Sequence, residues 1–211
     1  MALLSLVLSL LAATAILAAD PDPVQDFCVA DLDSSTSVNG AACLTTASAR
    51  EDNFTSTVLR NVQPVSTPGG FVASRVTVPQ LPALNTQGLS VNRVDLGPGG
   101  VNTPHVHPRA TELIYIMEGT VQAGFVDTTN KLFLKTLQKG DLFVVPRGLV
   151  HFQWNVGATP ATIFATFNSQ NPGVERLEIT LFGSGIPDAV LAASFRLNQS
   201  VINELKHSFT P

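Results

Sequence analysis

Charged residues are scarce in this sequence, and positive charge is scarcer than negative. Asp, Glu, Lys and Arg make up only 13% of the 211 residues, and the formal net charge is −4. Because the basic residues form no cluster, the chain lacks the electrostatic footprint of a protein that binds nucleic acid or an anionic membrane surface. Hydrophobic residues make up 45% of the chain, which provides for a substantial core in one domain or at most two.

Cysteine is nearly absent, since Cys28 and Cys43 are the only two in the chain. In a secreted protein, two cysteines most simply form one disulfide. Closing a loop of about 15 residues in this way stabilises the fold by about 3 kcal/mol, less any strain. A redox or metal-binding role is the less favoured alternative, because neither cysteine lies near the histidine motifs described below.

Long apolar runs are also missing, except at the N-terminus. Residues 3–17 are nearly all apolar and are followed by small residues at Ala18 and Ala19. This pattern indicates a secretory signal peptide over residues 1–19, although the usual basic residues are lacking. An uncleaved membrane anchor is the alternative, but the small residues followed by DPDP favour cleavage. No later run is long enough to span a bilayer, so we expect a secreted mature protein without a membrane anchor.

Two sequons suggest sites for N-glycosylation. Asn53-Phe54-Thr55 lies in a polar stretch and is the better candidate, since glycan acceptors lie in surface loops. Asn198-Gln199-Ser200 opens a helix-like segment, where an N-cap role for Asn198 is an alternative explanation.

Short runs rich in Val, Ile, Phe and Thr alternate with turns that contain Gly, Pro and Asn between Gly70 and Leu181. Many short strands at this spacing predict an all-β sandwich or barrel, which we assign to residues 70–183. The predicted strands include FVASRVTV, LSVNRVDL, TELIYIM, VQAGFVD, KLFLKTL, DLFVVP, HFQWNV, TIFATF and RLEITLF.

The pattern changes after Pro187, where DAVLAASF and NQSVINELKHSF carry apolar residues at helical spacing. Asp188 and Asn198 are the predicted caps of these helices. The mature chain thus divides into an N-terminal extension, residues 20–69, the barrel, and a C-terminal helical segment, residues 184–211. The helical segment packs either on a neighbouring subunit, as an oligomerisation segment, or on its own barrel.

Two histidines lie one residue apart in a strand-like stretch, at His105 and His107. On a strand, residues i and i+2 face the same side, so these imidazoles can converge on one ion. Glu112 has the opposite parity on a continuous strand. We expect Pro108 to break the strand and reset the parity, so that Glu112 turns to the same interior.

His151 follows the apolar strand DLFVVP and is the expected fourth ligand, whereas His207 is expected at the surface of the C-terminal helix. Three imidazole nitrogens and one carboxylate suit Mn, Fe, Ni, Cu or Zn, and they disfavour Ca²⁺. Four protein ligands leave two open positions on an octahedral ion, where substrate can bind. The alternative is that His105 and His107 are loop histidines beside a structural glutamate.

These residues belong to a longer pattern in two parts. The parts run Gly99-x5-His105-x-His107-x4-Glu112-x6-Gly119 and Gly140-x5-Pro146-x-Gly148-x2-His151-x3-Asn155. In these motifs the chain resembles the cupin superfamily and, within it, the germins and germin-like proteins of plants. The resemblance covers essentially the whole mature chain, through stretches such as DPDPVQDFCVADL, HPRATE, PRGLVHFQ and FNSQNPG.

The resemblance implies a cupin β-jelly-roll barrel with short C-terminal helices that clasp neighbouring subunits. The implied assembly is a homohexamer, a trimer of dimers. The implied cofactor is Mn²⁺, held by His105, His107, Glu112 and His151, and the two cysteines would form the family's disulfide. The implied setting is the extracellular matrix, or apoplast.

Germins proper are oxalate oxidases, which convert oxalate and O₂ into CO₂ and hydrogen peroxide, and many relatives are reported as superoxide dismutases. The resemblance therefore implies an oxidoreductase that generates hydrogen peroxide in the cell wall and in defence. Two asparagines that hold oxalate in the oxalate oxidases correspond to Asn92 and Asn102. An outward-facing Asn92 and a turn-forming Asn102 are the alternatives. Thr103 and Trp154 depart from the germin pattern, and small changes in pocket shape can abolish turnover.

Two non-enzymatic interpretations are kept beside the oxidoreductase. Auxin-binding relatives use a similar site with zinc and act as receptors. A structural or storage protein of the cell wall would carry a vestigial metal, which the intact ligand set disfavours. Metal identity separates the redox enzyme from the receptor, because zinc does not change its oxidation state.

Overall fold

The computed structural model describes residues 25–37, 39–61, 65 and 70–209. The predicted signal peptide, residues 1–19, lies outside this part of the chain, as does the beginning of the predicted extension. Within the described part, no helix is long and apolar enough to span a bilayer.

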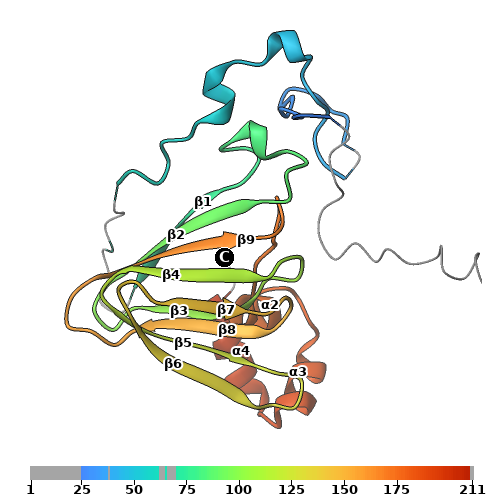
Figure 1. Ribbon diagram of the computed structural model, residues 1–211. Coiled ribbons are helices and arrows are strands. Elements are labelled where there is room, and N and C mark those ends of the chain that lie inside the picture. The colour runs from blue at the N-terminus through green and yellow to red at the C-terminus, as the bar shows by residue number, and fades with distance from the viewer. Residues whose placement is uncertain (1–24, 38, 62–64, 66–69, 210–211) are drawn as a thin grey trace, which may run out of the picture.

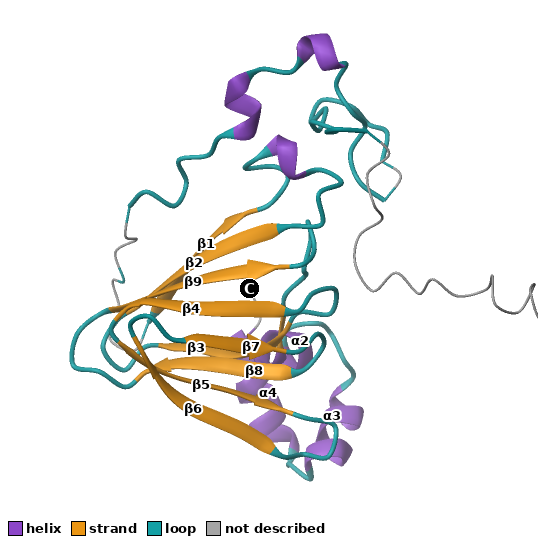
Figure 2. Cartoon of the chain, in the orientation of Figure 1, coloured by secondary structure: helices purple, strands orange, loops and turns teal. Residues whose placement is uncertain are grey.

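The strands form two antiparallel five-stranded sheets that face each other (Figure 1). The first sheet has the order β1 (Phe71–Val76), β2 (Ser90–Leu96), β9 (Ala161–Phe167), β4 (Glu112–Glu118), β7 (Leu142–Val145). The second has the order β10 (Glu175–Arg176), β3 (Val101–Val106), β8 (Val150–Asn155), β5 (Thr120–Val126), β6 (Leu132–Gln138). The all-β prediction is confirmed, and the colouring by secondary structure shows the two layers of strands (Figure 2).

The core lies between the sheets because side chains alternate in and out along each strand. On β4, Glu112, Ile114 and Ile116 are buried, whereas Leu113 and Tyr115 are exposed. The apolar cluster that fills the interior consists of Val94, Leu96, Ile114, Ile116, Val121, Ala123, Leu137, Val145, Ala161 and Ile163. Glu112 therefore joins an interior that is otherwise apolar along its own strand.

The strand predicted at RLEITLF is wrong. Only Glu175–Arg176 are extended, as β10, and the chain then turns into helix α2 (Leu177–Phe182). Leu177 and Leu181 are four residues apart, so the same apolar residues fit a helix as well as a strand. Tertiary packing favours the helix over the strand, because α2 lies against β3 and α4.

Helices α3 (Asp188–Phe195) and α4 (Gln199–Phe209) confirm the predicted C-terminal helices. Asn198 caps α4, since its Oδ1 accepts a hydrogen bond from the Val201 amide at 3.1 Å. The predicted cap at Asp188 is wrong, because the N-cap is Pro187. Asp188 is instead the first helical residue, and its carboxylate pairs with Lys206 of α4.

The three α-helices lie together on one side of the barrel, and the N-terminal segment lies beyond β1 and β2 (Figure 1). This segment includes the 3₁₀ helices η1 (Thr46–Ser48) and η2 (Glu51–Phe54) and the Cys28–Cys43 disulfide. Asn85 fastens it to the barrel by donating to the Ala41 carbonyl at 2.8 Å, just after η3 (Pro82–Leu84). Asn53 lies in η2, half-buried, and its glycosylation stays a prediction.

Candidate metal centre

Three histidines and one glutamate converge inside the barrel. They are His105 on β3, His107 just beyond β3, Glu112 at the start of β4 and His151 on β8. Each is at most 4% exposed, and one potential ligand atom from each lies within 4.8 Å of the others. Ligand atoms about 2.1 Å from a shared ion would lie about 3 to 4.2 Å apart, so the cluster has the size of a metal site.

Backbone register explains the convergence of these four residues. His105 on β3 lies directly opposite His151 on β8, which places their imidazoles side by side. The turn at Pro108 and Arg109 then separates His107 from β4, and Glu112 begins β4 with an inward-facing side chain. The expected bend at Pro108 is thus observed.

Each imidazole is oriented by a backbone carbonyl. The Nδ1 atoms of His105, His107 and His151 lie 2.7, 2.5 and 2.9 Å from the carbonyl oxygens of Thr103, Gly173 and Leu149. A carbonyl oxygen can only accept, so each Nδ1 carries the proton and donates. The Nε2 lone pairs therefore remain available for a metal, an arrangement common to metal-binding histidines.

Two of the ligand atoms face each other with no hydrogen-bond partner. His151 Nε2 and Glu112 Oε2 are both buried and lie 2.9 Å apart. With the proton on Nδ1, this contact joins two lone-pair acceptors, which is costly in a buried site. A cation between them removes the conflict, so the residues present fit a bound metal ion.

Burial favours the neutral form of His105 and His107, which is the form that binds metal. Burial, followed by the charge of His151, lowers the pKa of His105 to about 2. Burial also lowers the pKa of His107, against the opposing influence of Glu112. Protonation of these two imidazoles is therefore disfavoured before any metal binds.

The metal-free protein should lose stability as the pH falls below about 6.5, the ordinary pKa of histidine. Above this pH, His105 is neutral in both folded and unfolded chains and contributes no pH dependence. Below it, the unfolded chain binds a proton that the folded His105 refuses down to a pH of about 2. The free energy of unfolding then falls by up to about 1.4 kcal/mol per pH unit for each such imidazole.

Urea unfolding of the metal-free protein at pH 7.5 and pH 5 measures this effect. A His105→Gln variant should show a shallower pH dependence, and a His207→Gln variant, changed at an exposed position, should match the unmodified chain. An unfolding midpoint that rises on acidification would contradict the prediction.

A small cavity of about 10 Å³ adjoins the cluster. Both predicted substrate-binding asparagines line it, and Asn92 and Asn102 are 8% and 5% exposed. Asn102 and His105 are three residues apart on β3, and a register shift between them allows both side chains to face inward. Asn92 and Asn102 thus lie beside the ligands rather than at the protein surface.

The two asparagines differ in how their amides are used. Asn102 Nδ2 donates to Gln153 Oε1 at 2.5 Å, and its Oδ1 accepts from Arg176 at 3.4 Å. No hydrogen bond joins the Asn92 side chain to another described residue. Asn92 is therefore the freer of the two to bind a ligand.

Sequence reasoning missed Gln153, Arg75 and Arg176 near the ligands. Arg75 and Arg176 line the cavity with the metal-binding cluster, and Gln153 holds Asn102. Arg176 was overlooked because it begins the wrongly predicted strand RLEITLF.

Two residues depart from the germin pattern. Thr103 donates to Glu178 at 2.6 Å, and Trp154 is 41% exposed.

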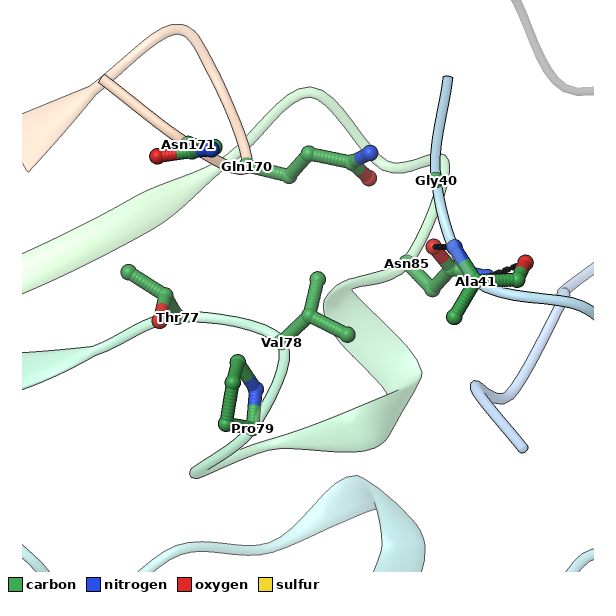
Figure 3. Close-up of a pocket in the computed structure, with 8 residues that line it drawn as sticks. All are labelled: Gly40, Ala41, Thr77, Val78, Pro79, Asn85, Gln170 and Asn171. Atoms are coloured by element: carbon green, nitrogen blue, oxygen red, sulfur yellow. Dashed lines mark hydrogen bonds between the residues drawn. The ribbon is translucent and has the colours of Figure 1, made fainter. Parts of the chain in front are cut away.

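A second cavity, of about 300 Å³, lies where the N-terminal segment meets the barrel (Figure 3). Asn85 and Ala41 form one side through their hydrogen bonds, with Val78 and Gln170 also bordering the cavity. All eight residues that line it are uncharged, so they offer neither acid–base groups nor metal ligands of the kind found in the cluster.

Two facing antiparallel sheets with three histidines and a glutamate turned inward are typical of a cupin barrel with a candidate metal site. Residues 57–203 match the Cupin family. The chain belongs to the germins and germin-like proteins within that family. It is 51% identical to germin-like protein subfamily T member 2 of Arabidopsis thaliana, covering 92% of this chain and 88% of that one.

Similarity to oxalate oxidases is nearly as high. Over 97% of this chain and 94% of the relative, it is 47% identical to oxalate oxidase 2 of Hordeum vulgare. A solved oxalate oxidase in complex with the substrate analogue glycolate superposes with a TM-score of 0.86 at 46% identity. That match covers 90% of this chain and 98% of the other. The relatives support a germin-type oxidoreductase.

Proposed function

We propose that the protein is a secreted, manganese-dependent oxidoreductase that generates hydrogen peroxide from oxalate. In the reaction, oxalate is oxidised to two molecules of CO₂ while O₂ takes up two electrons and two protons to give hydrogen peroxide. The observation that carries the proposal is the pair of facing acceptors, His151 Nε2 and Glu112 Oε2, beside a cavity lined by amides. The similarity to oxalate oxidases supports oxalate as the substrate.

Bound manganese would supply one-electron redox chemistry and positive charge for an anionic substrate. The protein contributes orientation, because three carbonyl oxygens hold the imidazole rings. Asn92 offers an amide donor to a substrate carboxylate at the cavity wall. The cavity favours a small substrate, since with the side chains as they stand its volume is close to that of a single ordered water.

Superoxide dismutase activity is the second candidate function. The same small cavity favours it, since superoxide is smaller than oxalate and needs no amide pair to position it. The Asn102 amide also favours superoxide as the substrate, because it already donates to Gln153 and leaves fewer donors for a dicarboxylate. A zinc-binding receptor or a structural wall protein would use the same ligands without redox chemistry.

Assays on protein reconstituted with manganese test the proposal. Hydrogen peroxide release should depend on both oxalate and O₂, and zinc-loaded protein should release none. Superoxide consumption, measured on the same sample, reports the second candidate. Manganese binding without peroxide from oxalate would overturn the oxalate oxidase assignment, and activity with superoxide alone would establish the dismutase in its place.

We also propose that the protein acts in the apoplast as a homohexamer, a trimer of dimers. One supporting feature is an apolar patch on the outer face of the first sheet, next to its edge strand β7. Leu113 lies opposite Val144, and Tyr115 lies opposite Leu142, which is 61% exposed. An exposed apolar face beside a strand edge is typical of a subunit interface.

Leu142→Glu should break the hexamer, because it places a charge within this patch at its most exposed residue. Light scattering coupled to size-exclusion chromatography should give six chains for the wild type and fewer for the variant. Lys139→Glu, on the neighbouring exposed turn, should leave the mass unchanged. A Leu142→Glu variant that keeps six chains would exclude this patch as an interface.

A further inference from the structure

Arg176 lies next to the metal-binding cluster through the backbone. It belongs to the two-residue strand β10, where it pairs directly with the ligand His105 on β3. Its side chain lines the same small cavity as Asn102 and Asn92. Arg75, from β1 in the other sheet, lines this cavity as well. Two arginines from opposite sheets, the exposed Arg75 and the half-buried Arg176, thus line a cavity beside a single carboxylate ligand, Glu112.

The Arg176 side chain is held in place but forms no ion pair with another described residue, although Glu178 lies near it through Thr103. It stacks over the Phe71 ring at 4.7 Å, and its Nη1 donates to Thr103 Oγ1 at 3.0 Å. Within the described part of the chain, the ion pairs include neither Arg176 nor Arg75. Both of its hydrogen bonds use Nη1, so other N–H donors of the same guanidinium are left for a ligand.

Charge balance favours an anion of more than one negative charge. Glu112 offsets one of the two charges of a divalent ion, and the neutral histidines offset none. The guanidinium of Arg176 adds to the charge that remains, and Arg75 adds less because it is exposed to solvent. A monoanion would leave part of this excess uncompensated, whereas a dianion such as a dicarboxylate reduces it further. Burial lowers the pKa of Arg176 against the opposing influence of Glu178, and Arg75 lowers it as well.

We propose that Arg176 is a specificity-determining residue that binds the outer carboxylate of a dicarboxylate whose other end lies at the metal-binding cluster. Arg75 adds positive potential behind it. The inference rests on the proposed oxidation of oxalate and assigns a role to a residue outside the ligand set. The 3.4 Å contact between Arg176 and Asn102 is long for a hydrogen bond, so Arg176 can exchange it for a carboxylate at little cost.

Making room for the substrate is part of the same role. The cavity of about 10 Å³ is too small for a dicarboxylate with the side chains as they stand. Arg176 is only half-buried and can move outward with the carboxylate that it binds. The release of Asn102 Oδ1 in this movement would also let the Asn102 amide readjust toward the substrate.

Calorimetric titration of manganese-loaded protein with oxalate and with formate tests this role by binding rather than by turnover. Arg176→Gln should weaken oxalate binding about 10- to 100-fold, since it removes a charge-assisted hydrogen bond. Binding of formate, which has no second carboxylate, should change less than about threefold. Arg60→Gln removes the same charge at an exposed position and should leave both ligands unaffected.

Metal content and the unfolding midpoint, measured on each variant, separate ligand binding from structural damage. If Arg176→Gln fails to fold, Arg176→Lys is the variant to test. It keeps the charge but loses the planar pair of donors, so it should still weaken oxalate binding more than formate binding. If affinity for oxalate and affinity for formate fall equally, or if oxalate affinity is unchanged, the role of Arg176 is overturned while the proposed function is left intact. A wild-type protein that binds manganese but not oxalate overturns the proposed function and this inference with it.

Discussion

His151→Ala is expected to weaken manganese binding by more than about 100-fold and to abolish hydrogen peroxide production. Changing groups that merely orient metal ligands already costs about 10- to 100-fold in affinity, so loss of a ligand should cost more. His151 lies opposite His105 and 2.9 Å from Glu112, in the middle of the cluster. Its removal deprives a metal ion of one of four ligands and opens the site on the β8 side.

Competition with a chelator of known affinity measures this loss on the variant and the wild type. His207→Ala serves as the matched control, because it removes an exposed imidazole from α4 and should leave metal affinity unchanged. Circular dichroism on the metal-free forms checks that the barrel is intact. A His151→Ala protein that binds manganese within about tenfold of the wild type would contradict the ligand assignment.

Asn92→Ala is expected to lower kcat/KM for oxalate about 100-fold or more, while manganese binding and superoxide consumption are kept. The Asn92 amide lines the cavity and has no hydrogen bond within the described part of the chain, so a substrate carboxylate can use it. Loss of one preorganised donor typically costs about 10² to 10³ in rate. Superoxide needs no such positioning, so its consumption should persist.

Asn92→Asp separates hydrogen bonding from packing. The aspartate has nearly the same shape, but it lacks the amide donor and repels a dianion. It should therefore be at least as defective with oxalate as Asn92→Ala. Unchanged oxalate turnover in either variant would remove the positioning role, and joint loss of manganese would show that Asn92 supports the ligand site.

Much of the fold could be predicted from local patterns. The short β-rich runs and the turns between them identified most strands, since alternation and turn chemistry act within a few residues. RLEITLF was misread because Leu177 and Leu181 suit both a strand and a helix. Contacts of α2 with α4 and β3, which are distant in sequence, decided the outcome. The prediction that Asp188 caps α3 was wrong for a similar reason, because its carboxylate pairs with Lys206 from another helix.

The four candidate ligands could be found because their spacing matches the two cupin motifs, and strand periodicity independently brought His105 and His107 together. The surroundings of the ligands could not be found in this way. The inward orientation of Asn102 depends on a register shift in β3, and its contact with Gln153 depends on pairing with β8. Arg176 reaches the cavity only because β10 pairs with β3 across a separation of about seventy residues. Such contacts arise from tertiary register, which sequence periodicity does not encode.

Elemental analysis of the protein purified from its natural source, followed by a peroxide assay with oxalate on the same sample, tests the central claim most directly. The account predicts one manganese ion per chain and hydrogen peroxide release that depends on oxalate. Zinc in place of manganese, or a chain without metal, would contradict the assignment of a redox metal centre to His105, His107, Glu112 and His151.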